Sequence, residues 1–194
     1  MSNRQINIED FLYKLKDNGV HIICALPFEA NNTKNIFYSG LGKINAAIKS
    51  VELIKTYNPK KIINYGSCGA INTELSGIIK INKFIQHDID CTPLGFKRGI
   101  TPYDDVQEIT LEDSEGYSCA SGDYFVSDKS TISSDVVDME AYAIAKTCKI
   151  YDIKFACYKY ISDNADNKAA SNWKENCSKG FDLFLNHLQE FRGR

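Results

Sequence analysis

Residues 44–69, INAAIKSVELIKTYNPKKIINYGSCG, decide the fold because they contain a complete helix-to-strand unit. Apolar side chains recur at helical spacing from Ile44 to Ile54, and Asn58-Pro59 closes that segment. The dense run Lys61–Tyr65 predicts a buried strand, and Gly66-Ser67-Cys68-Gly69 predicts a loop directly after it. A unit of this kind is typical of an α/β protein.

The same alternation continues on both sides of this unit. The predicted helices cover residues 8–15, 137–151 and 169–191, and the predicted strands cover residues 20–25, 36–39, 78–85, 117–120 and 154–161. The acidic segment Asp104–Glu115 is interpreted as a solvated loop. This order predicts an α/β domain with a largely parallel sheet that is covered by helices on both faces.

Length and composition exclude several classes of protein. The 194 residues are expected to form one domain, residues 1–194, in which residues 1–19 are an N-terminal helical extension. Hydrophobic residues make up 43% of the chain and charged residues 25%, which is ordinary for a globular protein. A net charge of −2 argues against nucleic acid as a partner. No apolar run approaches the ~18 residues of a membrane helix, so no membrane partner is expected.

The cysteines predict a reducing compartment. The chain has seven of them, an odd number, and none forms the C-x-x-C spacing of zinc ribbons and redox motifs. Several lie in apolar runs such as Ile22–Ala25 and Phe155–Cys157, where they are interpreted as buried small hydrophobic residues. The N-terminus lacks a secretory pattern, so we expect a cytoplasmic protein.

The candidate ligand site lies where the predicted strands end. In α/β sheets, ligands bind beyond the carboxyl ends of the strands. Carboxylates and glycine-containing turns collect there, and they include Glu29, Gly40-Leu41-Gly42, Gly66–Gly69, Asp88 and Ser162-Asp163. The sequence therefore predicts a polar site that is built from several strand ends.

Two glycine-containing motifs at these ends have more than one interpretation. Gly40-x-Gly42-x-x-Asn45 follows a strand as a dinucleotide fingerprint would, but it lacks the third glycine, and Asn64 occupies the place of the acidic residue. A tight turn fits better than a nicotinamide cofactor. Gly66–Gly69 lacks the G-x-S-x-G pattern of a nucleophilic serine, so its backbone N–H groups are expected to hold a ligand oxygen or a water molecule.

Two further polar features have an ordinary explanation beside the functional one. His87-Asp88-Ile89-Asp90 contains one histidine, which strand alternation directs away from the two aspartates, so no metal site is predicted. Glu140 lies in the apolar run Val136–Ala141, which is interpreted as part of a helix. A carboxylate in such a run is costly unless it has a partner, which favours a functional role over a solvated face.

Six motifs follow one another along the chain: Ala25–Ala30, Ser39–Lys43, Ile63–Gly69, Ser121–Val126, Val137–Ala141 and Ile161–Asp163. Taken in this order, they resemble the nucleoside phosphorylase/nucleosidase superfamily, and the most similar branch is the 5'-methylthioadenosine/S-adenosylhomocysteine nucleosidases. The resemblance extends from about Val20 to Phe191 and implies a three-layer αβα fold with a central mixed, largely parallel sheet.

The resemblance implies a catalytic role for three residues. Glu29 corresponds to the base that activates the attacking water, Asp163 to the acid that protonates purine N7, and Ser162 to the residue that orients this acid. Breaking an N-glycosidic bond builds positive charge on the ribose and negative charge on the base, and carboxyl groups can serve both needs. No metal or organic cofactor is expected.

The resemblance also implies a set of substrate-binding residues. Glu140 corresponds to the acceptor for the ribose hydroxyls and Met139 to the residue packed beneath the sugar. Phe125 would stack on the purine, while the backbone of Val126 would contact the purine edge. Ser67 and Gly69 would line the water or phosphate region. Three further positions would lie near the 5' substituent: Leu41, Cys91 and Leu94. Phe96 corresponds to an aromatic residue that reaches into the site of the partner subunit in a homodimer.

The chain also departs from the family pattern, which leaves the substrate open. Asn64 stands where the phosphate-using relatives place an arginine, and this favours hydrolysis over phosphorolysis. The sequence Ser67-Cys68-Gly69-Ala70 resembles that of the phosphorylases, however, so phosphorolysis stays an alternative. Only ten residues separate Glu29 from Gly40, where the family has an extra pair of strands, and Lys159 replaces an arginine. Another nucleoside, such as a futalosine-type substrate, or a non-catalytic nucleoside-binding function also stays open.

Overall fold

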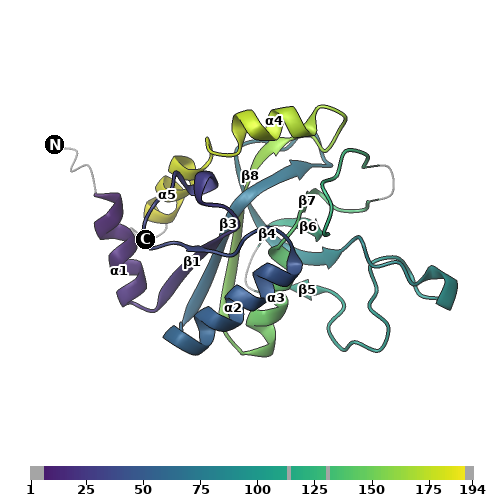
Figure 1. The fold of residues 1–194 in the computed structure, drawn as a ribbon, viewed down its shortest axis with the longest axis horizontal. Coiled ribbons are helices and arrows are strands. Elements are labelled where there is room, and N and C mark those ends of the chain that lie inside the picture. Colours follow the sequence, from purple (N-terminus) through teal and green to yellow (C-terminus); the bar gives the residue numbers. More distant parts are fainter. Residues whose placement is uncertain (1–6, 113–114, 130–131, 191–194) are drawn as a thin grey trace.

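The central layer of the protein is a mixed sheet whose core strands run parallel (Figure 1). The computed structural model describes residues 7–112, 115–129 and 132–190. Its elements are α1 (Ile8–Asp17), β1 (Val20–Cys24), η1 (Pro27–Ala30), β2 (Phe37–Tyr38), α2 (Lys43–Tyr57), β3 (Lys61–Ala70), β4 (Ile78–Gln86), η2 (Thr92–Leu94), β5 (Ile109–Thr110), β6 (Tyr117–Ser121), β7 (Val136–Asp138), α3 (Ala141–Ile150), β8 (Lys154–Asp163), α4 (Ala169–Asn176) and α5 (Phe181–Glu190).

The strand pairings close part of the sheet on itself. β2, β1, β3 and β8 pair in parallel, whereas β4 pairs antiparallel with β8 and parallel with β6. β6 in turn pairs with β7, and β7 pairs antiparallel with β3, which completes a ring of five strands. The mixed, largely parallel α/β sheet expected from the sequence is therefore confirmed.

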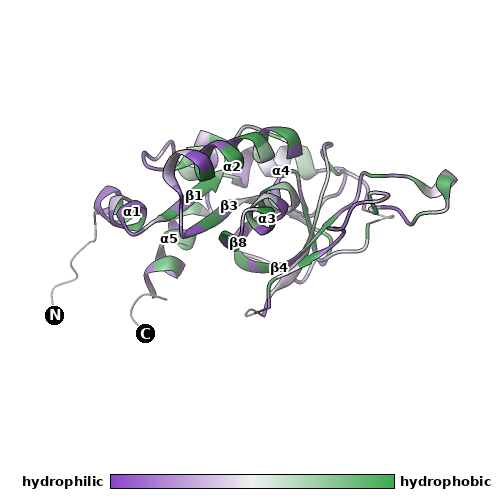
Figure 2. Ribbon diagram, turned by 90° about the horizontal axis from the view of Figure 1, so that it is seen from below, coloured by the Kyte–Doolittle hydropathy of each residue, from purple (hydrophilic) through white to green (hydrophobic). Residues whose placement is uncertain are grey.

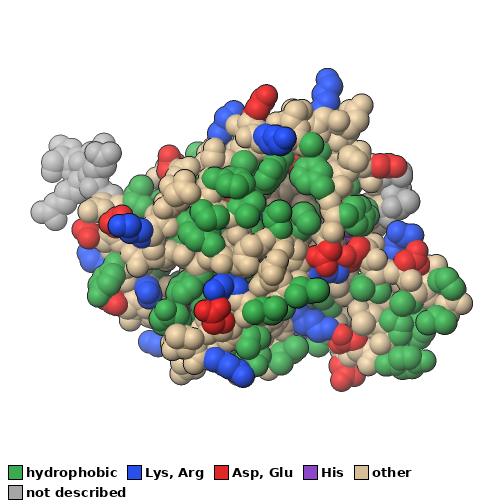
Figure 3. All heavy atoms as spheres, viewed as in Figure 1, with side chains coloured by type: hydrophobic (Ala, Val, Ile, Leu, Met, Phe, Trp, Pro, Cys, Tyr) green, Lys and Arg blue, Asp and Glu red, His purple; other side chains and the backbone are tan. Residues whose placement is uncertain are grey.

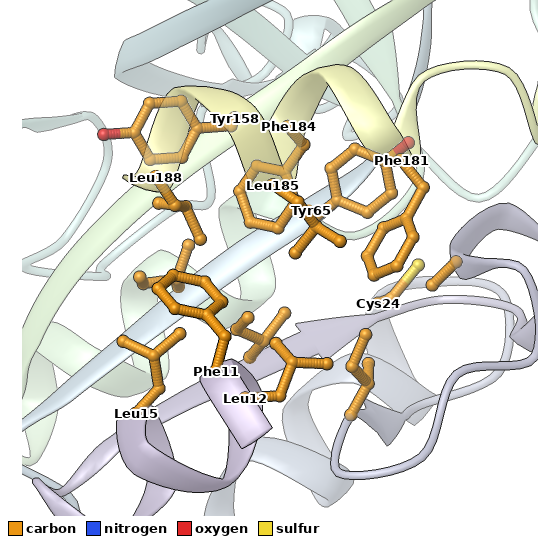
Figure 4. Packing of buried hydrophobic residues seen from close by; sticks show 14 of the residues in the cluster. Phe11, Leu12, Leu15, Cys24, Tyr65, Tyr158, Phe181, Phe184, Leu185 and Leu188 are labelled. Atoms are coloured by element: carbon orange, nitrogen blue, oxygen red, sulfur yellow. The ribbon is translucent and has the colours of Figure 1, made fainter. Parts of the chain in front are cut away.

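Helices cover both faces of this sheet. Neighbouring residues of β3 point to opposite sides: Ile62 packs with α2 and α3, whereas Ile63 packs with α1 and α5. In the second of these layers, Tyr65 stacks on Phe184 with the ring centroids 4.5 Å apart, and Leu12 of α1 joins the same cluster (Figure 4). Figure 2 shows that α1 and α5 present their green, hydrophobic sides to this layer. These two layers hold β3 rigidly in the middle of the molecule.

The structure corrects three of the predicted elements. Gly66–Gly69 is part of β3 rather than a loop, because β8 and β7 pair with it there. Val136–Asp138 is strand β7, and the helix begins only at Ala141. The predicted final helix is two helices, α4 and α5. The chain turns at Gly180, where a Cβ atom would collide with the side chain of Tyr160.

The acidic segment 104–115 is more ordered, in its described part, than the solvated loop that we expected. It contributes strand β5, whose Ile109 is buried and pairs with Phe84 of β4. Asp104 forms an ion pair with Lys146 of α3. Within the described residues, no helix combines the length and the apolar character needed to cross a membrane.

Candidate active site

One cavity of about 240 Å³ collects residues from seven separate segments of the chain. It is lined by Ala25, Glu29, Leu41, Ser67, Cys68, Gly69, Tyr124, Phe125, Val126, Val137, Asp138, Met139, Glu140, Asp163 and Trp173. The residues from β3, β7 and β8 lie in the carboxyl-terminal parts of these strands. Hydrophobic side chains gather near the centre of the face that carries β3 and α4 (Figure 3).

Glu29 is held rigidly at one wall of this cavity. The 3-10 helix η1 follows β1 and places the Glu29 carboxylate where Leu26 N–H donates to Oε2 at 3.0 Å. The backbone N–H and the hydroxyl of Ser67 both donate to Oε1, at 2.9 and 2.6 Å. Three hydrogen bonds to a carboxylate that is only 3% exposed leave it little freedom to rotate.

Asp163 occupies another wall of the cavity, and burial has the largest effect on its carboxyl group. Burial raises the pKa of its carboxyl group above the usual range, although hydrogen bonds from Ala165 N–H and the Ser162 hydroxyl oppose this shift. The Ser162 hydroxyl has one proton and two acceptors, Asp163 Oδ2 at 2.8 Å and the Cys68 carbonyl at 3.1 Å. It can therefore donate to the ionised aspartate or, once Asp163 is protonated, turn to Cys68.

Glu140 and Asp138 lie at the junction of β7 and α3, next to a buried cation. Asp138 pairs with Lys159 Nζ at 2.7 Å, and both side chains are 1% exposed. The paired ammonium group lowers the pKa of Asp138. Glu140 Oε1 accepts a hydrogen bond from Gly42 N–H at 2.8 Å, and burial, reinforced by the charge of Asp138, raises the pKa of Glu140 to about 8.

Gly69 permits the close approach of β3 to the acid. A Cβ atom at this position would lie 2.8 Å from Asp163 Oδ1 and 3.2 Å from the Ala165 side chain. Any larger residue would therefore displace the carboxyl group of Asp163. Gly66, three residues earlier on β3, is also closely surrounded. A Cβ atom added there would lie 3.3 Å from Lys159 Nζ and 3.8 Å from Glu29 Oε1.

Most of the site residues predicted from the sequence line this cavity. They are Glu29, Asp163, Ser67, Gly69, Phe125, Val126, Met139, Glu140 and Leu41. Ser162 lies behind Asp163 and contacts it directly. Cys91, Leu94 and Phe96 do not line the cavity. They belong to the segment that projects from the body between β4 and β5 in Figures 1 and 2. Glu140 precedes α3 as its N-cap residue rather than lying inside a helix, which corrects the sequence interpretation.

Six lining residues were not assigned to the site from the sequence: Ala25, Cys68, Tyr124, Val137, Asp138 and Trp173. Asp138 lies two residues before Glu140 in a motif that was recognised, so its proximity was available as a signal. Trp173 is the chain's single tryptophan and lies ten residues after Asp163, but nothing in its local pattern directs it to β3. Among the described residues, no group of three or more His, Cys, Asp and Glu side chains has the arrangement of a metal site.

Comparison with known proteins agrees with this α/β architecture. The sequence profile of the phosphorylase superfamily matches residues 25–191. The chain therefore belongs to this superfamily. The 5'-methylthioadenosine/S-adenosylhomocysteine nucleosidase of Staphylococcus haemolyticus is 35% identical over 162 residues, with 71% of each chain covered.

Solved structures share the fold at lower identity. A mutant of the Helicobacter pylori 5'-methylthioadenosine/S-adenosylhomocysteine nucleosidase, with 5'-methylthioadenosine in its active site, superposes with a TM-score of 0.78 at 19% identity. The match covers 89% of this chain and 99% of that one. Futalosine hydrolase of the same organism also gives a TM-score of 0.78, at 18% identity, and covers 88% and 97% of the two chains.

The raised pKa of Glu140 predicts a pH-dependent stability. Between the ordinary value of 4.5 and about 8, the folded protein binds a proton at Glu140 that the unfolded chain has released. The free energy of unfolding should therefore fall by on the order of a few kcal/mol as the pH rises from about 5 to about 9. Urea unfolding of the wild type and of Glu140→Gln measures this effect, because the variant lacks the titrating group.

Glu175→Gln is the matched control, since it removes the charge of an exposed carboxylate on α4. It should follow the wild-type stability across the same pH range. If Glu140→Gln and the wild type lose stability in parallel, Glu140 is not protonated in the folded protein at neutral pH.

Proposed function

We propose that this chain hydrolyses the N-glycosidic bond of a purine nucleoside and releases the free base, with 5'-methylthioadenosine and S-adenosylhomocysteine as its substrates. The observation that carries this proposal is that three of the four carboxyl groups lining one cavity, all except the ion-paired Asp138, lie in different environments. Glu29 is fixed by donors, Asp163 is inclined to hold a proton, and Glu140 faces the space between them. The names of the curated relatives support the choice of substrates.

Asp163 supplies the proton that the departing purine requires. Cleavage leaves negative charge on the base, and a carboxylic acid with a raised pKa can donate to a purine nitrogen near neutral pH. Once Asp163 has given up its proton, Ser162 stabilises the aspartate that is left, because the Ser162 hydroxyl can turn from the Cys68 carbonyl to Asp163 Oδ2. Phe125, whose ring lies against Trp173 at the cavity, offers an apolar face for the purine.

Glu29 activates the water that attacks the ribose. Its carboxylate accepts hydrogen bonds from Ser67 and Leu26, which fix the direction in which its remaining lone pairs point. Glu140 and Met139 line the same cavity and are assigned to the ribose hydroxyls and the face of the sugar. The Glu29 carboxylate also stabilises the positive charge that develops on an oxocarbenium-like ribose. This chemistry requires neither a metal nor an organic cofactor.

Water is favoured over phosphate as the nucleophile. Among the described residues that line the cavity there is no Lys, Arg or His. Asn64 donates to the Ile23 and Tyr65 carbonyls inside the sheet, and the ammonium group of Lys159 is neutralised by Asp138. Phosphate requires fixed cationic donors, which this site does not offer. A phosphorolytic reaction and a futalosine-type substrate are the alternatives, the latter because futalosine hydrolase has the same fold.

Free adenine should appear when the purified protein is incubated with 5'-methylthioadenosine in phosphate-free buffer, with methylthioribose as the other product. Chromatography of both products, with and without added phosphate, checks this. Adenosine and inosine serve as comparison substrates. Strict dependence on phosphate, with a sugar 1-phosphate as product, would replace hydrolysis by phosphorolysis. Binding without any release of base would favour the non-catalytic alternative.

Asp163→Asn should lower turnover with adenine nucleosides by about 10²- to 10⁴-fold, with only a modest change in KM, because the variant cannot donate the proton. A riboside with a p-nitrophenyl leaving group needs no proton and should be affected much less. Glu29→Gln is the matched comparison and should damage both substrates, since each requires an activated water. Equal losses on both substrates for Asp163→Asn would show that Asp163 positions the ligand instead.

The projecting segment between β4 and β5 supports a homodimer, which we propose as the assembled form. Leu94 is 72% exposed and Tyr103 is 96% exposed, and hydrophobic side chains cover this end of the molecule in Figure 3. A second copy of the chain would bury them and bring Phe96 toward its partner's cavity. Sedimentation at micromolar concentration should give the mass of a dimer, and Leu94→Asp should weaken it. A fully active monomer would contradict this assembly.

The buried, unpaired thiols support a cytoplasmic location.

A further inference from the structure

Trp173 is hydrogen-bonded to Ser67, the residue that holds the proposed base Glu29. Its indole N–H donates to Ser67 Oγ at 2.9 Å, and Ser67 Oγ lies 2.6 Å from Glu29 Oε1. The two partners are 106 residues apart in the chain, so only the tertiary fold brings them together. Trp173 is also the single tryptophan of the protein, which makes its surroundings observable by fluorescence.

The direction of these hydrogen bonds is set by chemistry. An indole nitrogen can only donate, so Ser67 Oγ must be the acceptor from Trp173. The single hydroxyl proton of Ser67 is then left to point at the Glu29 carboxylate. Without the indole donor, the hydroxyl could rotate away, and only the Ser67 backbone N–H would still fix Oε1.

The ring of Trp173 is itself supported from two sides. Phe28 and Phe125 both pack edge to face against it, with ring centroids 5.8 and 6.2 Å from that of Trp173, respectively. The helix that carries it, α4, is anchored by Asn176, whose side-chain amide donates to the Ser162 carbonyl at 2.9 Å. The same short helix therefore contacts Ser67 on the side of Glu29 and Ser162 on the side of Asp163.

We propose that Trp173 is a positioning residue that orients the Glu29 carboxylate through the Ser67 hydroxyl. This role rests on the proposed function, in which Glu29 activates water. A phenylalanine at position 173 would preserve the aromatic wall of the cavity but would lack the donor. The nitrogen atom, not the ring, therefore determines the orientation of the base.

The test is a double-mutant cycle of Trp173→Phe and Ser67→Ala, with base release measured as kcat and KM across pH. Trp173→Phe should lower kcat roughly 3- to 10-fold with little change in KM, as expected for one hydrogen bond. In the Ser67→Ala background, the same substitution should have almost no further effect.

Two controls separate positioning from packing. Phe28→Leu removes a ring contact to Trp173 without removing a donor, so it should lower kcat much less than Trp173→Phe does. Far-UV circular dichroism and thermal unfolding check that each variant is folded. If Trp173→Phe costs as much in the Ser67→Ala background as in the wild type, or changes KM alone, Trp173 is only a wall of the cavity.

Fluorescence gives a readout that is independent of turnover. Ser67→Ala should shift the emission maximum of Trp173 in the free protein, because the indole N–H loses its acceptor. An unchanged emission would overturn the hydrogen bond on which the positioning role depends. A wild-type protein that releases no base from any of the nucleosides overturns the proposed function instead, so the two failures are distinguishable.

Discussion

The ion pair between Lys159 and Asp138 is the interaction on which the site depends. Its two side chains are almost completely buried, and Asp138 also accepts hydrogen bonds from Ser121 Oγ and Ala141 N–H. It thereby joins β8, β7, β6 and the first residue of α3 at one point. Removing one partner of such a pair leaves an uncompensated buried charge, which typically costs about 3–5 kcal/mol. The position of Glu140, which directly precedes α3, depends on this junction.

The same pair controls the electrostatics of the cavity. Because Asp138 neutralises Lys159, the ammonium group is not available to bind an anion from solution, whereas the negative charge of Asp138 helps to raise the pKa of Glu140. Burial, with a smaller contribution from the charge of Asp166, raises the pKa of Asp163 on the other wall. The Glu29 carboxylate accepts hydrogen bonds from Leu26 N–H and from the N–H and hydroxyl of Ser67. Three chemically similar carboxyl groups can thus take three different roles, since each has a different set of neighbours.

β3 is the element that brings these groups within reach of one ligand. Ser67 and Gly69 of this strand line the cavity. Because Gly66 and Gly69 have no side chains, the side chains of Lys159, Glu29 and Asp163 can approach the backbone of β3. The helices on both faces keep this strand in place through the packing of Ile62 and Tyr65. α4 then closes the cavity from the carboxyl-terminal part of the chain, through Trp173 and Asn176.

The sequence by itself determined the α/β class and most of the lining of the cavity. Dense apolar runs mark buried strands, and Glu29, Glu140 and Asp163 lie within motifs that follow or flank them. Local patterns could not show that Gly66–Gly69 continues β3, because that depends on pairing with β7 and β8. Apolar residues around Val136 and Val137 suit a strand as well as a helix, so only the ring of strands decided between them. The bond from Trp173 to Ser67, and the pKa values of Glu140 and Asp163, were decided by tertiary structure alone, because burial and contacts over 106 residues are not encoded in any local spacing.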